Sequence, residues 1–175
     1  MAKLNIVKDG DPILHKTSRP VEAITPRILT LLDDMTETMR AANGCGLAAV
    51  QVGILRRIVV MEVEEGTVYE MINPEIIKKK GQQQEMEGCL SVPGKYGITD
   101  RPLTVTVRYT DRDGQTCELT GTELLARAIC HETDHLDGIL FTDHALIILT
   151  PEELAELIGT DQRNGGCPNG GARNC

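Results

Sequence analysis

The nine residues from Cys130 to Gly138, Cys-His-Glu-Thr-Asp-His-Leu-Asp-Gly, constrain this chain more than any other stretch. They contain the pattern H-E-x-x-H, in which His131 and His135 are four residues apart. Side chains at this spacing lie one turn apart on the same face of a helix, so both imidazoles can bind one metal ion. Glu132 would then lie beside the metal and take a proton from a water molecule that the metal activates. The pattern predicts a helix that carries a metal site.

The residues around this motif also favour a helix. Leu124 is placed on the same helical face as His131 and His135. Residues 120–123, Thr-Gly-Thr-Glu, match a capping box, and Gly138 matches a helix C-cap. The motif is therefore expected in the last turns of a helix that packs against an apolar core.

Periodicity and turn residues predict the α+β fold class, with mostly antiparallel strands packed around the central metal-binding helix. An N-terminal helix is expected to begin at Pro26, behind the N-cap Thr25, and to end before Gly44. A short C-terminal helix is expected from Pro151. Pro74 is expected to interrupt the second of the predicted strands. The strands are predicted at 57–63, 67–72, 75–78, 103–109 and 116–119, with turns that join the first two and the last two into hairpins.

The length of 175 residues fits one domain with its own core. A single catalytic domain is expected at 1–159, followed at 160–175 by a flexible Gly/Asn/Cys tail in which apolar residues are sparse. Aromatic residues make up only 2% of the chain, so the core must be aliphatic. The net charge of −8 argues against direct DNA binding, which needs a concentrated basic surface.

No apolar stretch has the length that spans a membrane, and the first residues match neither a secretory nor a transit signal. A cytoplasmic location is therefore expected. Reducing conditions there argue against disulfide bonds among the six cysteines. Most of them are expected to be small buried residues or exposed thiols.

Two imidazoles leave a catalytic metal site incomplete, because such sites use three protein ligands. A longer protease pattern would place a third histidine at position 141, where this chain has Phe141. The C-terminal helix offers carboxylates, although acidic residues at a helix start are already explained by the helix dipole. The thiolate of Cys89, in a glycine-containing stretch before a turn, is the strongest candidate of the three. The carboxylates in question are Glu152, Glu153 and Glu156.

Three separated motifs make the chain similar to the peptide deformylase family. Residues 44–51, Gly-Cys-Gly-Leu-Ala-Ala-Val-Gln, match its first motif, G-φ-G-φ-A-A-x-Q, where φ is an apolar residue. Residues 87–91, Glu-Gly-Cys-Leu-Ser, match the second, and residues 131–138 match the third. The motifs occur in the family's order, within a resemblance that covers about residues 4–150. The resemblance implies that Cys89 is the third metal ligand, beside the two histidines.

The resemblance also implies an activity, the removal of the formyl group from the N-terminal formyl-methionine of nascent polypeptides, with release of formate. Glu132 would act as the general base and acid, because amide hydrolysis needs a proton on the leaving amine. The side-chain amide of Gln51 and the backbone N–H of Leu90 would donate to the developing oxyanion. The implied metal is Fe²⁺ in the cell, with Zn²⁺, Ni²⁺ or Co²⁺ as substitutes, and a thiolate with imidazoles suits such ions.

The first motif is expected to bind substrate. Gly44 and Gly46 lack Cβ atoms, so an extended substrate backbone can approach them closely. The resemblance adds Cys45 and Leu124 to the methionine pocket. The implied partners are N-formylated nascent peptides and, through them, the ribosome. Two departures from the family pattern stand out. Many members have Gln where this chain has Cys130. Some bacterial members end in a long basic helix associated with ribosome docking, whereas this chain is expected to end in a short acidic helix and the Gly/Asn/Cys tail.

Two other functions are compatible with the residues taken alone. A small endoprotease of the H-E-x-x-H type is the alternative enzyme, against which Phe141 counts. A structural metal-binding module would need a fourth ligand to close the site. His144, Cys130 or a cysteine of the tail would have to supply that ligand.

Overall fold

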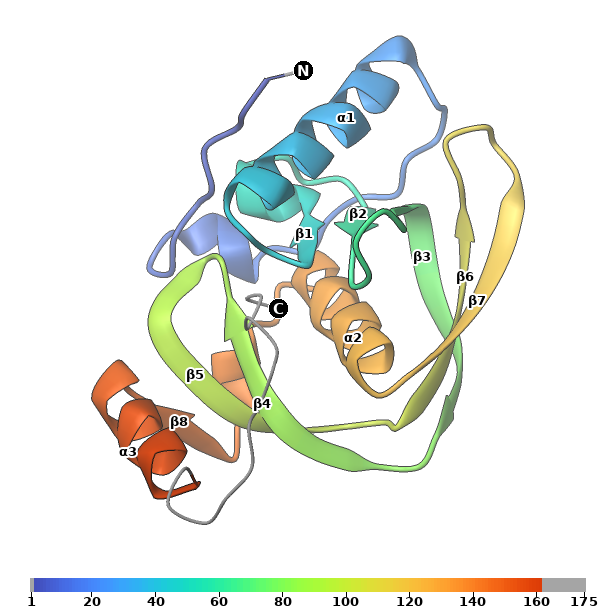
Figure 1. Cartoon of the computed structure of the whole chain (residues 1–175). Helices are drawn as coiled ribbons and strands as arrows, with labels where there is room; N and C mark the ends of the chain where they lie inside the picture. Colours follow the sequence, from blue (N-terminus) through green and yellow to red (C-terminus); the bar gives the residue numbers. More distant parts are fainter. Residues whose placement is uncertain (1, 162–175) are drawn as a thin grey trace.

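The computed structural model describes residues 2–161 and has an α+β fold (Figure 1). Helix α2 lies at the centre of Figure 1, between the strands of two antiparallel sheets. The predicted fold class is thereby confirmed. The α-helices are α1 (Pro26–Ala41), α2 (Leu124–Leu136) and α3 (Pro151–Asp161), and the short 3₁₀ helices are η1 (Pro12–His15), η2 (Ala49–Val52) and η3 (Phe141–Asp143).

The first sheet has five strands in the order β1-β2-β3-β6-β7, and the second has three in the order β4-β5-β8. The antiparallel pairings of β2 with β3 and of β6 with β7 confirm the two predicted hairpins. A third hairpin, β4–β5, was not predicted. The strands are β1 (Gly46–Ala48), β2 (Ile58–Met61), β3 (Tyr69–Lys80), β4 (Gln83–Cys89), β5 (Val92–Arg101), β6 (Thr104–Thr110), β7 (Thr116–Thr122) and β8 (Ile147–Leu149).

Strand β3 does not stop at Pro74, so the predicted interruption is wrong. The register of β3 against β6 shifts between Ile72 and Glu75, which makes this a bulge. A proline is tolerated in a bulge because its missing N–H removes no bond from the ladder. Asn73 takes a left-handed φ of 52° there, and its side chain exchanges two hydrogen bonds of 2.8 Å with the backbone of Val21.

The start of α2 also differs from the prediction. Residues 120–122 belong to β7, and the helix begins only at Leu124. Glu123 is the N-cap residue, but its side chain makes no capping bond, so the predicted capping box is wrong. Its backbone has φ 55° and ψ −119°, a conformation that costs a non-glycine residue on the order of 1–3 kcal/mol. The neighbouring strands therefore impose this helix start.

The core is aliphatic, as predicted, and it encloses α2. Ile129 and Leu136 of the helix pack into one cluster with residues of β1, β2, β3 and β6. Phe141, the single phenylalanine of the chain, is 1% exposed and its ring stacks on that of His131, with 6.2 Å between centroids. Apolar contacts thus fix the helix that carries the motif histidines from both sides.

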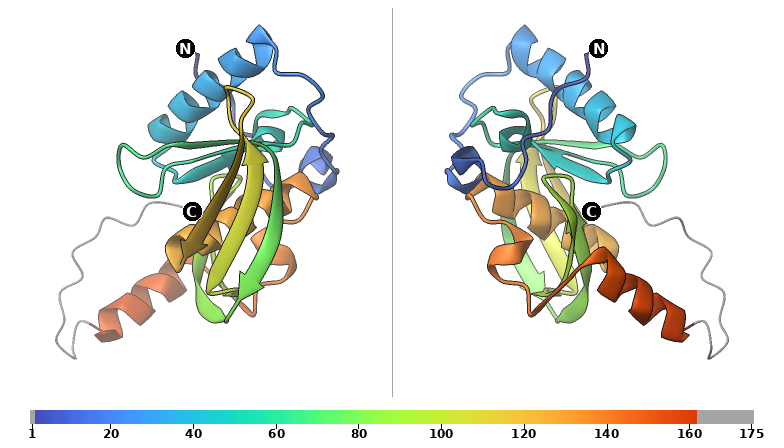
Figure 2. Two further views of the ribbon diagram at one scale, coloured as in Figure 1. Left: turned by 90° about the vertical axis from the view of Figure 1, so that its right-hand side faces the viewer. Right: turned by 90° about the vertical axis from the view of Figure 1, so that its left-hand side faces the viewer.

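Helix α3 projects from the rest of the molecule (Figure 2) and contacts β5 and β8. It begins at Pro151, as predicted, and continues to Asp161. The remaining residues of the predicted tail, 162–175, lie outside the described residues. Over residues 2–161, no helix is long and apolar enough to cross a membrane.

Candidate metal centre and active site

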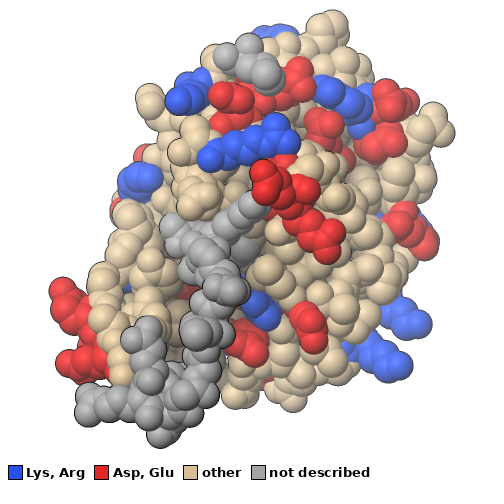
Figure 3. Space-filling view, viewed as in Figure 1, with Lys and Arg blue, Asp and Glu red and all other residues tan. Residues whose placement is uncertain are grey.

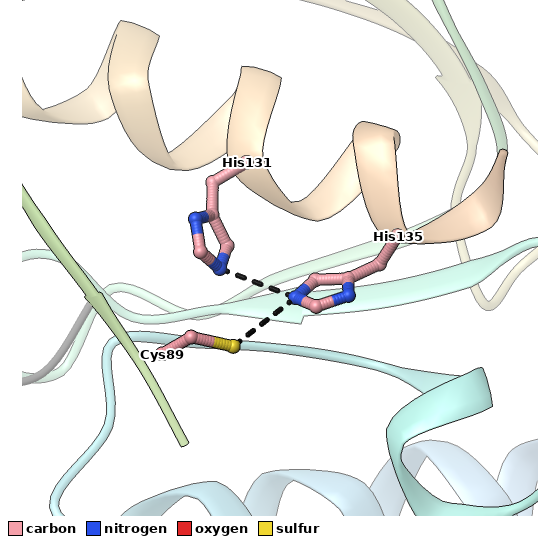
Figure 4. A group of neighbouring side chains, drawn as sticks. All are labelled: Cys89, His131 and His135. Atoms are coloured by element: carbon pink, nitrogen blue, oxygen red, sulfur yellow. Dashed lines mark hydrogen bonds between the residues drawn. The ribbon is translucent and has the colours of Figure 1, made fainter. Parts of the chain in front are cut away.

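Cys89, His131 and His135 converge on one point. The Sγ atom of Cys89 lies 3.4 Å from Nε2 of His135, although 46 positions separate the two residues. The Nε2 atoms of His131 and His135 are 3.2 Å apart. Figure 4 shows the thiol approaching from β4 and both imidazoles from α2. All three ligand atoms lie within 4.8 Å of one another.

These separations fit one divalent metal ion. Metal–ligand bonds of about 2.0–2.3 Å at tetrahedral angles place ligand atoms roughly 3.3–3.7 Å apart, close to what is observed. All three side chains are buried. One shared proton can join only two of these three ligand atoms, whereas a cation between them accepts a lone pair from all three. The donor set of one thiol and two imidazoles suits zinc or ferrous iron.

The other candidates for the third ligand lie elsewhere. Phe141 is part of the core beside the site. The acidic residues of α3 are exposed, and the only group of three candidate ligands among residues 2–161 is the Cys-His-His set. Burial and the neighbouring charge of His131 hold the pKa of His135 well below its usual range, which keeps its lone pair available. The exposed acidic residues of α3 that were candidates for the third ligand are Glu152, Glu153 and Glu156.

Glu132 lies between the two histidines in sequence and is 2% exposed. Its Oε2 atom has no hydrogen-bond partner in the described part of the chain. Burial raises the pKa of this carboxyl to about 7, because the opposing charge of His131 only partly compensates. A group with a pKa near neutrality both accepts and donates protons readily, as a general base and acid must.

The glycines of the first motif make room for side chains of the site. A Cβ atom on Gly46 would overlap the carboxyl group of Glu132, with Cδ only 2.8 Å away. A Cβ atom on Gly44 would lie 2.5 Å from Cδ1 of Leu90. Neither glycine has a positive φ. The structure therefore shows a reason for these glycines beyond substrate approach, since they admit Glu132 and Leu90.

Gln51, in η2, is 1% exposed and has its amide orientation fixed from both ends. Its Oε1 accepts from the backbone N–H of Ala48 at 2.9 Å. Its Nε2 therefore points into the site, 3.1 Å from Oγ of Ser91 and 3.6 Å from Sγ of Cys89. A donor group is thus held beside the metal ligand Cys89.

Sequence reasoning gave no role to Glu87, although the residue belongs to the second motif. Its Oε2 lies 2.9 Å from Nδ1 of His131, and the carboxyl also accepts from Thr99 and Arg101. Burial alone would raise the pKa of Glu87, but the bonds to His131 and Arg101 outweigh it and hold the pKa far below its usual range. Residues 99 and 101 carry no motif, and only the pairing of β5 with β4 brings them here.

The four predicted substrate residues lie in two segments of the fold. Gly44 and Cys45 directly precede β1, Gly46 begins it, and Leu124 is the first residue of α2 with 37% exposure. A cavity of about 400 Å³ adjoins Gly44. A larger one, about 940 Å³, lies elsewhere, at the N-terminal end of α1, and contains none of the predicted site residues.

One expectation about the cysteines is wrong. Cys45 is disulfide-bonded, whereas Cys89, Cys117 and Cys130 are free thiols. A disulfide needs two sulfur atoms within bonding reach as well as oxidising conditions, and the expectation considered only the second requirement. Burial raises the pKa of Cys130 to about 11, so this thiol next to His131 stays protonated.

A buried Cys-His-His metal site with an adjacent glutamate of raised pKa defines a metal-dependent hydrolase with a single metal ion. The polypeptide deformylase family model matches residues 3–148. The peptide deformylase of Alkaliphilus metalliredigens is 59% identical over 143 residues, which are 82% of this chain and 97% of that protein. The chain belongs to the peptide deformylase family.

Other relatives agree. The peptide deformylase of Caldanaerobacter subterraneus is 54% identical over 88% of this chain and 96% of its own length. The crystal structure of peptide deformylase from Thermotoga maritima superimposes with a TM-score of 0.81 at 34% identity, over 84% of this chain and all of that one. The enzyme from Ehrlichia chaffeensis in complex with actinonin gives 0.81 at 38%, over 94% and 98%. The chain is thus an enzyme that acts on formylated peptides, and the endoprotease alternative is not supported.

Proposed function

We propose that this peptide deformylase works in the cytoplasm on nascent polypeptides that begin with formyl-methionine, and that Cys89, His131 and His135 hold its metal. The observation that carries the proposal is the convergence of these three ligands beside the buried carboxyl of Glu132. When bound, the metal supplies Lewis acidity that polarises the formyl carbonyl and activates a water molecule.

Glu132 moves the proton. Its carboxylate accepts a proton from the attacking water as the water oxygen bonds to the formyl carbon. The carbon–nitrogen bond then breaks, and the same carboxyl returns the proton to the leaving amine, so the products are formate and a free N-terminus. A pKa of about 7 suits both steps, because neither protonation state is strongly preferred near neutral pH.

Gln51 and Leu90 stabilise the oxyanion. The fixed amide of Gln51 donates to Oγ of Ser91 at 3.1 Å and makes a longer contact of 3.6 Å with Sγ of Cys89, so the second hydrogen can turn to an oxygen next to the metal ligands. The second donor is the backbone N–H of Leu90, the residue after the metal ligand Cys89. Donors fixed in advance favour the transition state because they need no reorganisation as charge develops.

The substrate peptide extends sheet β1-β2-β3-β6-β7 at its β1 edge. Among the described residues β1 pairs only with β2, so its outer edge can accept an extended chain. Gly44 and Gly46 lie along this edge, with Cys45 and Leu124 at the methionine side chain. The cavity of about 400 Å³ beside Gly44, with Arg40 and Asn43 in its wall, receives later residues of the peptide.

Fe²⁺ is the proposed metal in the cell, with Zn²⁺, Ni²⁺ and Co²⁺ as substitutes. The mixed thiolate and imidazole set accommodates each of these ions, and a ferrous thiolate centre is sensitive to oxidation. Acidic side chains lie over α3 in the lower left of Figure 3. Such a helix is poorly suited to bind ribosomal RNA, so we propose that the enzyme meets nascent chains without docking through α3.

Formate release from a formyl-Met-Ala-Ser peptide tests the proposal. Protein purified without oxygen is reconstituted with Fe²⁺ or Zn²⁺ and compared with metal-free protein. We expect stoichiometric formate and free amine, with faster turnover for the iron form and none without metal. Cleavage of an internal peptide bond, or formate release that persists after complete metal removal, would contradict the proposal.

A further inference from the structure

We infer that Arg101 is a positioning residue that locks the hairpin carrying Cys89 to the helix carrying both histidines. This inference rests on the proposed roles of these three residues as metal ligands. Arg101 is the last residue of β5 and is 6% exposed. It touches no ligand itself, so its effect passes through two carboxylates.

The guanidinium group of Arg101 holds Glu87 with a two-pronged contact. Its Nε donates to Oε1 of Glu87 at 2.7 Å, and its Nη2 donates to Oε2 at 3.0 Å. Thr99 donates to the same Oε1 at 2.6 Å. Paired donors of this kind fix the plane of a carboxylate as well as its position. The carboxylate of Glu87 therefore cannot rotate away from His131.

Glu87 passes this order to the site. Its Oε2 accepts from Nδ1 of His131 at 2.9 Å, which places the ring proton on Nδ1 and leaves the lone pair of Nε2 directed at the metal position. Partners of this type orient metal-binding histidines and raise their basicity. Glu87 also lies two residues before Cys89 on β4. The position of this one carboxylate therefore affects both the thiol of Cys89 and the imidazole of His131.

The third nitrogen of Arg101 reaches the second histidine. Its Nη1 donates to Oδ2 of Asp134 at 2.6 Å, and Asp134 directly precedes His135 on α2. A single side chain therefore holds the carboxylate that binds His131 and the carboxylate next to His135. Lysine could not replace it, because an ammonium group is a point charge without the planar array of donors that these two carboxylates engage.

A buried ion network could also serve folding alone, and the rate of metal release separates these roles. We compare Arg101→Lys and Arg101→Gln with Arg108→Gln, a control that breaks an exposed pair in which Arg108 donates to Glu118 at 2.8 Å. Each protein is loaded with Co²⁺ or Zn²⁺ and mixed with an excess of chelator. Release from both Arg101 variants should be roughly 10–100-fold faster than from wild type, and release from the control unchanged.

Two further measurements keep the inference open to refutation. The absorption of the Co²⁺ proteins should shift in the Arg101 variants, because the ligand geometry relaxes, while a purely structural role predicts an unchanged spectrum and a lower melting temperature only. Asp134→Asn removes one anchor at a partly exposed position and should speed release to a smaller extent, which keeps the test available if Arg101→Gln does not fold.

Wild-type release rates and spectra in Arg101→Lys and Asp134→Asn would overturn the inference, whatever their melting temperatures. Failure of the proposed function gives a different result. In that case the wild-type protein would not retain stoichiometric metal, and this inference would fall with the proposal. Stoichiometric wild-type metal with unchanged release from the variants would refute the role of Arg101 alone.

Discussion

The two halves of the metal centre are built in different ways. Helix α2 supplies His131, Glu132 and His135 from one short segment, and the helical repeat alone puts both imidazoles on one face. The β4–β5 hairpin supplies Cys89, which depends on strand pairing and on a bulge at which Cys89 faces Val92. One half is local and the other depends on long-range contacts, so substitutions in the two halves should fail differently.

Loss of Cys89 should have the largest effect, because it removes the hairpin's only ligand. Cys89→Ala leaves two imidazoles, and we expect bound metal to fall to a trace and activity with it. Elemental analysis of the purified protein measures the metal directly. Cys130→Ala is the matched control, since that buried thiol has a pKa raised to about 11 and does not ligate. Full metal content in Cys89→Ala would refute the ligand assignment.

Loss of Glu132 should separate chemistry from metal binding in the helical half. Glu132→Ala removes the proton carrier but none of the ligands, so we expect kcat to fall by about 10²–10⁴ with metal retained. The measurement pairs formate release with metal content on the same sample. Glu132→Gln keeps the shape of the side chain and should lose as much activity. A fully active variant of either kind would show that another group transfers the proton.

Loss of Gln51 tests a hydrogen-bond donor in η2, which belongs to neither half of the metal centre. Gln51→Ala removes the amide near Cys89, and we expect kcat to fall by about 10²–10³ with a smaller change in KM. Gln82→Ala, at an exposed amide, is the control. The substitution also leaves the N–H of Ala48 without its partner, so the melting temperature is recorded as well. A change in KM alone would assign Gln51 to substrate binding instead.

Gly46→Ala and Gly44→Ala sharpen the comparison, since one glycine borders the helical half and the other the hairpin. The new methyl group of Gly46→Ala meets the carboxyl of Glu132, so we expect kcat to fall by about 10²-fold. That of Gly44→Ala meets the flexible end of Leu90, which can move aside. Steady-state kinetics of both variants decide the point. Equal effects, mainly on KM, would favour substrate approach as the reason for both glycines.

The same division explains what the sequence could predict. The N-cap Thr25 and the helix from Pro26, both correct, depend on neighbours in the chain. Strand β4, with the sequence Gln-Gln-Glu-Met-Glu before Gly88, shows no apolar alternation and was missed. Its residues form a strand because β5 pairs with them, not because of their own preference.

The same difference between local and long-range contacts decides which site residues the sequence could predict. The spacing of His131 and His135 predicted two ligands from the helical repeat alone. Cys89 needed the family resemblance, because no local pattern relates a residue of one hairpin to a helix far along the chain. Arg101 was not predicted at all, since its role arises only when β5 lies beside β4 and α2.

The start of α2 offers the smallest and most specific test of how the helical half is placed. Glu123 is held at φ 55° by a backbone bond of 2.9 Å from its N–H to the carbonyl of Leu103. Glycine adopts this conformation without strain, so Glu123→Gly should stabilise the fold by about 1 kcal/mol. Thr116→Gly, at an ordinary exposed strand position, should destabilise it by a similar amount. Denaturant unfolding of both variants measures the difference, and a destabilised Glu123→Gly would mean that the helix start is not strained, so that α2 sets its own beginning.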